Sequence, residues 1–266
     1  MIQFRFRFVA ILSTIMTFCH LFGAIGAEPA EDWKPLFNGK NLEGWNVVID
    51  NSKSDDPNHL VQIDNGALHM YKNAKPDSKQ PAGYIETQKK YSNYRLRIQY
   101  MWGTNRFIPR IKSRRDAGLL YHIGGNDGVW PKCVECQIQE NDVGDIFMIH
   151  TRATALIDPA KTNEPAFLDP SQGGIEFLRG MAGAGGDYAR VIRNPMNEHD
   201  GWNTVEIIVR GDESTYIVNG KVNNRLTKIT EMEDGKWVPL KEGKIGLQLE
   251  YAEVYYRNIE IQEMKP

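Results

Sequence analysis

The chain has 266 residues, 41% of them hydrophobic and 25% charged, and its formal net charge at pH 7 is -2. This is the composition of an ordinary globular protein. The 34 acidic residues outnumber the 32 basic ones, so no basic excess attracts phosphate groups, and we expect no nucleic-acid partner.

The N-terminal segment differs from the rest of the chain. Two arginines, at positions 5 and 7, precede a mostly apolar run over residues 9–25, and small residues stand at positions 24, 26 and 27. This order is typical of a secretory signal peptide, and an uncleaved membrane anchor is the alternative. We expect residues 1–27 to be removed and residues 28–266 to form one secreted or periplasmic domain. No later segment is apolar and long enough to span a bilayer, so we expect no membrane partner after cleavage.

Alternation of apolar and polar residues dominates the remaining chain and is typical of half-buried strands. It is clearest over residues 94–100, 204–210, 244–250 and 254–261. Asn65-Gly66 and Asn219-Gly220 lie between alternating segments, and an Asn-Gly pair supplies the positive φ angles of a tight hairpin turn. Long segments with helical periodicity are absent. The pattern therefore predicts an all-β fold, a sandwich of two antiparallel sheets.

Two long segments, residues 73–81 and 158–186, lack a strand pattern, and we interpret both as loops. The second ends in a glycine-rich run over residues 180–186. This run lacks the Gly-Lys-Ser/Thr ending of a phosphate-binding loop. We interpret it as a flexible loop beside a binding face.

Cys133 and Cys136 have the spacing of a redox motif or of half a zinc site. They lie in an alternating segment, in which residues three apart point to opposite faces, about 10 Å from each other. That separation is too large for a disulfide unless the first cysteine sits in a turn. No second cysteine pair completes a zinc site, so we expect two unpaired thiols.

Polar residues gather at alternate positions of the segment over residues 130–142. Because the apolar residues at 134, 136 and 138 face the core, Glu135, Gln137 and Gln139 line the opposite face. Trp130 stands beside them. Amides, a carboxylate and an exposed indole suit the hydroxyls and faces of a sugar. Ordinary solvation of an outer face is the alternative.

Two further segments add polar residues to the same kind of face. Over residues 116–122, inward packing of Leu119 and Tyr121 directs His122 outward, where it is a candidate acid or base. Over residues 245–250, Gln248 and Glu250 lie opposite the apolar positions. Strands that each present Glu and Gln outward would together form the floor of a groove.

Four arginines, at positions 106, 110, 114 and 115, precede the His122 segment. An arginine at the edge of a groove stabilises an oxyanion during a reaction. The alternative for each of them is a solvated basic loop.

The segment Lys34–Trp45 reads KPLFNGKNLEGW and resembles the opening signature of the 3-keto-disaccharide hydrolase family. The resemblance spans residues 33–263 and continues in residues 91–102, 116–122, 130–140, 201–203, 219–220, 246–248 and 256–259. It implies a concanavalin A-like jelly-roll sandwich of two curved antiparallel sheets, with the site on the concave sheet. It also implies the reactions of 3-keto-glucoside 1,2-lyases and 3-keto-2-hydroxyglucal hydratases, and a small carbohydrate substrate.

The reaction that the resemblance implies needs three chemical groups. A ketone at C3 of a sugar acidifies the hydrogen on C2, so a base removes it, a cation or donor holds the enolate oxygen, and an acid protonates the leaving group. We expect Glu135 or His122 to be the base and Glu140 or Glu250 to be the acid.

The remaining candidate residues bind rather than transfer protons. We expect Arg115, Lys132 or a bound divalent metal to hold the enolate oxygen. No other cofactor is expected. The side chains expected to bind the sugar are those of Trp130, Gln137, Gln248 and Glu250.

Two alternative functions stay open. Glu135-x-Gln137-x-x-Glu140 is similar to the Glu-x-Asp-x-x-Glu strand of laminarinase-type retaining glucanases, where a bulge brings both glutamates to one face. Gln137 stands where that family has aspartate. The other alternative is a non-catalytic carbohydrate-binding module, which the same polar and aromatic side chains would serve.

Overall fold

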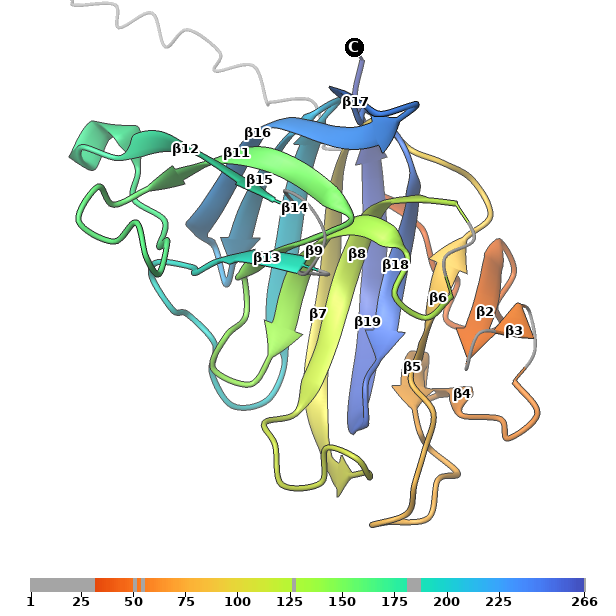
Figure 1. The fold of residues 1–266 in the computed structure, drawn as a ribbon. Coiled ribbons are helices and arrows are strands. Elements are labelled where there is room, and N and C mark those ends of the chain that lie inside the picture. The colour runs from red at the N-terminus through yellow and green to blue at the C-terminus, as the bar shows by residue number, and fades with distance from the viewer. Residues whose placement is uncertain (1–31, 50–51, 54–55, 126–127, 181–187, 266) are drawn as a thin grey trace, which may run out of the picture. The chain divides into compact units, whose positions relative to one another are not determined.

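The computed structural model describes residues 32–49, 52–53, 56–125, 128–180 and 188–265 (Figure 1). These residues belong to a compact unit over Asp32–Pro266. The predicted signal peptide and the glycine-rich run after residue 180 lie outside the described residues. The described chain contains no α-helix, only the short 3-10 helix η1 (Pro170–Gln172). No helix among these residues is long and apolar enough to cross a membrane.

The larger sheet, sheet A, is antiparallel. Its strands are β1 (Lys34–Pro35), β4 (Val61–Asp64), β5 (Ala67–Met70), β7 (Asn93–Arg106), β11 (Thr151–Ile157), β12 (Ile175–Gly180), β14 (Asn203–Arg210), β15 (Glu213–Val218), β16 (Lys221–Glu233), β17 (Lys236–Pro239) and β19 (Ala252–Glu263). Their order is β12-β11-β16-β15-β14-β7-β19-β5-β4, with β1 beside β19 and β17 beside β16.

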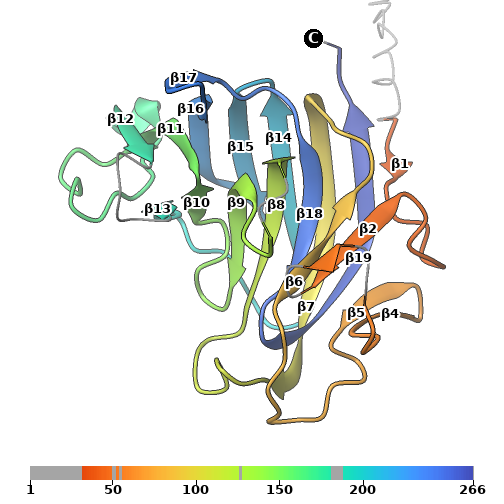
Figure 2. The same cartoon turned by 45° about the vertical axis from the view of Figure 1, so that its right-hand side comes forward.

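The second sheet, sheet B, is also antiparallel. Its strands are β2 (Trp45–Ile49), β3 (Ser52–Lys53), β6 (Gly83–Thr87), β8 (Asp116–Gly124), β9 (Lys132–Gln139), β10 (Ile146–Ile149), β13 (Tyr188–Val191) and β18 (Lys244–Leu249). Their order is β13-β10-β9-β8-β18-β6-β2-β3, and Figure 2 shows β8, β9 and β18 in one layer with β7, β14 and β19 in the other. The protein is the predicted jelly-roll sandwich of two antiparallel sheets.

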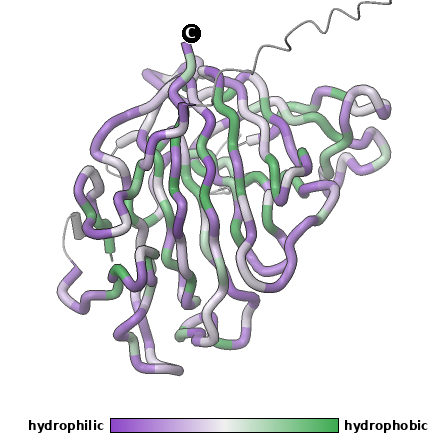
Figure 3. The backbone as a smooth tube through the Cα atoms, turned by 180° about the vertical axis from the view of Figure 1, so that it is seen from behind, coloured by the Kyte–Doolittle hydropathy of each residue, from purple (hydrophilic) through white to green (hydrophobic). Residues whose placement is uncertain are grey.

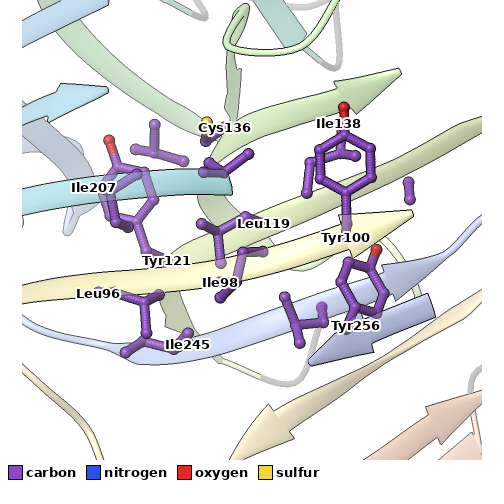
Figure 4. Packing of buried hydrophobic residues seen from close by; sticks show 14 of the residues in the cluster. Leu96, Ile98, Tyr100, Leu119, Tyr121, Cys136, Ile138, Ile207, Ile245 and Tyr256 are labelled. Carbon is purple, nitrogen blue, oxygen red and sulfur yellow. The ribbon is translucent and has the colours of Figure 1, made fainter. Parts of the chain in front are cut away.

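The main core fills the space between the sheets, where alternate residues of both layers meet (Figure 4). Ile98 and Ile207 of sheet A and Leu119 and Ile138 of sheet B are fully buried there. Full burial of such a side chain contributes about 1.5–3 kcal/mol. Figure 3 shows apolar and polar positions alternating along the long strands, as the sequence pattern predicts.

Both predicted hairpins are confirmed. Asn65-Gly66 joins β4 to β5, with Asp64 paired to Ala67, and Asn219-Gly220 joins β15 to β16, with Val218 paired to Lys221. Residues 73–81 form no named strand, but the predicted loop over 158–186 was wrong in part because it contains β12. This edge strand has mostly exposed or half-exposed side chains, so it lacks the apolar alternation of a half-buried strand.

A second buried apolar cluster covers part of sheet B on the side away from sheet A, here called the outer face. It consists of Val48, Tyr84, Leu120, Ile123, Cys133 and Ile149. Cys136 belongs to the main core instead, so the two cysteines face opposite sides of β9. Both thiols are buried, and both are unpaired, as predicted.

Candidate active site

Polar side chains occupy adjacent rows on the outer face of sheet B, across β9, β8 and the end of β18. In one row Gln137 pairs with Gly118, and the register of β18 brings Gln248 to the same level. In the next row Asp116 pairs with both Gln139 and Glu250. The strands of this face thus gather acids and amides that are far apart in the sequence.

Glu135 and Gln248 converge above Gly118. A Cβ atom added to Gly118 would lie 2.1 Å from Oε1 of Glu135 and 2.2 Å from Oε1 of Gln248. The two oxygens are therefore close neighbours above a residue with no side chain. Any other residue at this position would occupy the space into which both side chains point.

Arg110 joins the acids of the second row. Its Nη1 atom lies 2.5 Å from Oδ2 of Asp116 and also contacts Oε1 of Glu250. The amide of Gln139 donates a hydrogen bond of 2.5 Å to the same Oδ2 of Asp116. Arg110 lies in the connection from β7 to β8, and Ile108 in that connection donates a backbone hydrogen bond of 2.9 Å to Ser78. We call these seven residues the outer-face cluster: Arg110, Asp116, Glu135, Gln137, Gln139, Gln248 and Glu250.

Burial controls the protonation of this cluster. Asp116 is 2% exposed and Glu135 5%, whereas the Arg110 side chain is 29% exposed. Burial, with repulsion from Glu250 and Asp116, raises the pKa of Glu135 well above the usual carboxyl range. Burial also raises the pKa values of Asp116 and Glu250, against the attraction of Arg110. Because two of the three carboxyls share one guanidinium and the third contacts none, protons remain on the cluster near neutral pH.

Several buried polar atoms of the cluster have no hydrogen-bond partner among the described residues. They are Oδ1 of Asp116, Oε1 of Glu135, Oε1 of Gln137, and both Oε1 and Nε2 of Gln248. Buried polar atoms are nearly always paired with protein or water, so their concentration in one place is unusual. The arrangement is suited to take up the hydrogen-bonding groups of a small polar molecule.

His122 is not part of this cluster, and its predicted outward orientation was wrong. The register of β8 against β9 shifts between Tyr121 and Gly124, and His122 has a φ angle of 56°. Such a bulge reverses the face of the affected side chain. The Nε2 atom of His122 lies 3.0 Å from the carbonyl oxygen of Gly211, which follows β14 in sheet A. The imidazole therefore faces the interior of the sandwich, where burial lowers its pKa to about 4.

Three further predicted residues also lie away from the cluster. Nη2 of Arg115 lies 2.8 Å from Oε1 of Glu140, and Lys132 pairs with Glu231 of β16. Lys132 and Glu140 lie an odd number of residues from Glu135, so the alternation of the strand directs them away from the outer face. The register of β9 is unbroken from Val134 to Gln139. The bulge that would bring Glu135 and Glu140 to one face in a retaining glucanase is therefore missing from this strand.

Trp130 is 41% exposed and lies in the connection from β8 to β9. In the same connection the carbonyl oxygen of Gly128 accepts a hydrogen bond of 3.2 Å from the hydroxyl of Tyr84. Tyr84 belongs to the outer apolar cluster, so this connection reaches the outer face of sheet B.

A cavity of about 170 Å³ lies elsewhere, lined by Trp102, Arg115, Glu140, Asn141, Glu198, His199, Asp200 and Gly201. Two of its carboxylates, those of Glu140 and Glu198, already have partners. Glu198 accepts hydrogen bonds from the Tyr100 hydroxyl at 2.8 Å and the Trp102 indole at 2.9 Å. We place the candidate site at the outer-face cluster because several buried unpaired polar atoms lie side by side there.

The sequence pattern predicts no role for Asp116 and does not distinguish Arg110 from the other three arginines that precede β8. The sequence contains an indication for Asp116, because strand alternation from Gly118 places it on the outer face. It contains no such indication for Arg110, because the contacts of Arg110 with Asp116 and Glu250 depend on how its loop folds back. No group of three or more His, Cys, Asp or Glu side chains in the described part of the chain is placed to hold a metal ion.

Comparison with known proteins gives a family and a fold. The family model of the 3-keto-alpha-glucoside-1,2-lyase-like domain matches residues 32–262. A proposed glycosyl hydrolase from Parabacteroides distasonis is 19% identical, covers 89% of this chain and 96% of its own, and superposes with a TM-score of 0.53. A second such protein from the same organism gives 20% identity, 87% and 99% coverage, and a TM-score of 0.48. A carbohydrate-binding module of Bacillus subtilis is 11% identical, covers 84% of this chain and 98% of its own, and superposes with a TM-score of 0.45. The curated proteins contain no match.

Proposed function

The chain belongs to the family of 3-keto-alpha-glucoside-1,2-lyase-like domains and is a carbohydrate-active enzyme, and we propose that it cleaves 3-keto-glycosides by elimination across C1 and C2. One observation carries this proposal. The outer-face cluster combines three buried carboxyls, one guanidinium and two amides, those of Gln137 and Gln248, that have unpaired polar atoms. Elimination from a 3-keto sugar needs those groups: a base, an acid, and donors for an oxygen that gains charge.

The chemistry follows from the acidity of the C2 hydrogen. A base takes the C2 proton, and the electron pair of the C2–H bond delocalises onto the ketone oxygen as an enolate. The enolate then reforms the ketone while a double bond forms between C1 and C2 and the C1–O bond breaks. The departing oxygen takes a proton from an acid. Addition of water to the unsaturated product completes a net hydrolysis.

The outer-face cluster supplies groups for each step. Carboxyls with raised pKa values exchange protons near neutral pH, which suits both acid and base catalysis. Arg110 adds a positive charge that offsets the build-up of negative charge. The amides of Gln137 and Gln248 offer donors and acceptors to sugar hydroxyls.

Product analysis tests the proposal. Purified protein is incubated with a 3-keto-glucoside and with its unoxidised parent, with and without a chelator. We expect cleavage of the ketone-bearing sugar alone. Cleavage of the parent at a comparable rate would contradict the elimination chemistry. Glycan binding without any product would favour the carbohydrate-binding alternative, and loss of cleavage with chelator would support the predicted divalent metal.

Two variants connect the reaction to the cluster. Asp116→Asn and Glu250→Gln should each lower the rate of cleavage by about 10²–10⁴. Glu206→Gln is the matched control, because Glu206 pairs with Arg95 at 3.0 Å on sheet A and lies outside the cluster. Wild-type rates in both cluster variants would refute the site.

The N-terminal sequence supports a further proposal, that the protein acts in the periplasm or outside the cell. N-terminal sequencing of protein recovered from those compartments should begin near residue 28. A mature protein that retains residues 1–27 would contradict cleavage.

A further inference from the structure

The three carboxyls of the outer-face cluster differ in their partners, and this difference divides the catalytic roles. Arg110 contacts Asp116 and Glu250. Glu135 makes no ion pair in the part of the chain that is described, and its strand neighbours are Leu120 on β8 and Phe147 on β10. A buried carboxyl without a cation is stable in its neutral form. Asp116 and Glu250 share the single charge of Arg110, so one of them is the anion and the other keeps a proton. The pKa of Asp116 is raised to about 6 and that of Glu250 to about 8, so Asp116 is the anion of this pair.

The positions of Glu135 and Gln248 above Gly118 indicate that a neutral Glu135 acts as a hydrogen-bond donor. Oε1 of Glu135 and Oε1 of Gln248 lie within 2.2 Å of the same point, and both lack partners. An ionised Glu135 would place a negative charge against the amide oxygen of Gln248, and a protonated Glu135 avoids this repulsion. Both ends of the Gln248 amide are unpaired, so the amide can rotate without losing a hydrogen bond and present Nε2 to the same space. The pair then offers two donors to one oxygen atom.

Asp116 has the contacts of an oriented base. Arg110 and Gln139 both hold its Oδ2 atom, each at 2.5 Å, and leave Oδ1 buried and unpaired. One oxygen therefore fixes the carboxylate while the other is available to accept a proton. The pKa of Asp116 is raised by burial and lowered by Arg110, which suits a base that works near neutral pH.

We propose, as a consequence of the proposed function, that Glu135 and Gln248 donate hydrogen bonds to the C3 oxygen of the sugar and that Asp116 removes the C2 proton. Oδ1 of Asp116 forms a bond to that proton, and the C2–H electron pair moves to the C3 oxygen, which Glu135 and Gln248 stabilise without releasing a proton. When the ketone reforms and the C1–O bond breaks, Glu250 gives its proton to the departing oxygen. Because Gly118 has no side chain, Glu135 and Gln248 occupy the space above it, and their donor groups lie close together.

Substitutions that keep or remove a neutral donor test these roles. Glu135→Gln keeps a neutral donor and should retain kcat within about tenfold of wild type, whereas Glu135→Ala should lose about 10²–10³, as expected for a lost oxyanion donor. Asp116→Asn should lose at least about 100-fold. The low-pH limb of the kcat/KM profile should stay in place in Glu135→Gln. Glu206→Gln again serves as the control, and circular dichroism verifies that each variant folds.

The protonation state of Glu135 has a readout that needs no substrate. An infrared difference spectrum between wild type and Glu135→Gln at pH 7 should contain the carbonyl band of a protonated carboxylic acid. A carboxylate band in its place would overturn the donor role.

The kinetic outcomes separate this inference from the proposed function. If wild type cleaves 3-keto-glucosides but Glu135→Gln is as inactive as Asp116→Asn, Glu135 is the base and only the division of roles is wrong. If Asp116→Asn is as active as wild type, the role of Asp116 is wrong. If wild type cleaves no 3-keto-glucoside, the proposed function and this inference fail together.

Discussion

Replacement of Gly118 by alanine perturbs the candidate site at its floor. The added Cβ would lie 2.1 Å and 2.2 Å from the Oε1 atoms of Glu135 and Gln248, so both side chains must move apart. Overpacking of this kind costs about 1–3 kcal/mol, which lowers Tm by about 2–12 °C in a protein of this size. Separation of the two donors should reduce kcat by about 10²–10³, the effect of losing one oxyanion donor.

The assay is steady-state cleavage of a 3-keto-glucoside at a temperature well below the Tm of the variant. Gly124→Ala is the control on the same strand, because its added Cβ would meet only the flexible side chain of Lys132, at 3.2 Å. We expect near-wild-type kcat in the control and a large loss in Gly118→Ala. Wild-type kcat in Gly118→Ala would refute the argument that the packing of Glu135 and Gln248 above this glycine positions two donors of the site.

Three further predictions concern charge and burial. Arg110→Gln removes the cation that lowers the pKa of Asp116, so the low-pH limb of the rate profile should move to higher pH, and an unmoved limb would argue against this pairing. The pKa of His122 is about 4 in the folded protein and 6.5 in the unfolded chain. The neutral imidazole therefore contributes ~3 kcal/mol to the free energy of unfolding, which is complete above pH 6.5 and is lost as the pH falls toward 4. Chemical denaturation of His122→Asn should lack that pH dependence. Cys133 and Cys136 are buried thiols, so a thiol reagent should label them only after unfolding, and rapid labelling of the folded protein would contradict their burial.

The part of the site that the sequence predicts is the part that strand alternation determines. Glu135, Gln137, Gln248 and Glu250 lie on the face that their spacing predicts, because a regular strand directs every second side chain to the same side. The same rule failed for His122, because one bulge in β8 reverses a side chain and leaves no mark in the apolar pattern.

Contacts made by loops explain the other differences between the predicted and the observed site. Arg110 reaches Asp116 and Glu250 from a connection whose course depends on contacts with residues near Ser78. Glu140 follows the last residue of β9, where alternation and the turn direct it to Arg115 instead of Glu135. The fold itself was predictable, because it depends on many alternating segments and two Asn-Gly turns rather than on single contacts.

The most direct test of the central claim follows the C2 hydrogen of the substrate. A 3-keto-glucoside is cleaved in D₂O, and the released sugar is analysed by mass spectrometry and NMR, with the free sugar and the Asp116→Asn variant as controls for spontaneous exchange. Our account predicts that the released sugar either lacks the C2 hydrogen, as an unsaturated keto sugar, or carries deuterium at C2 after addition of water. Release of a sugar that keeps its original C2 hydrogen would contradict it.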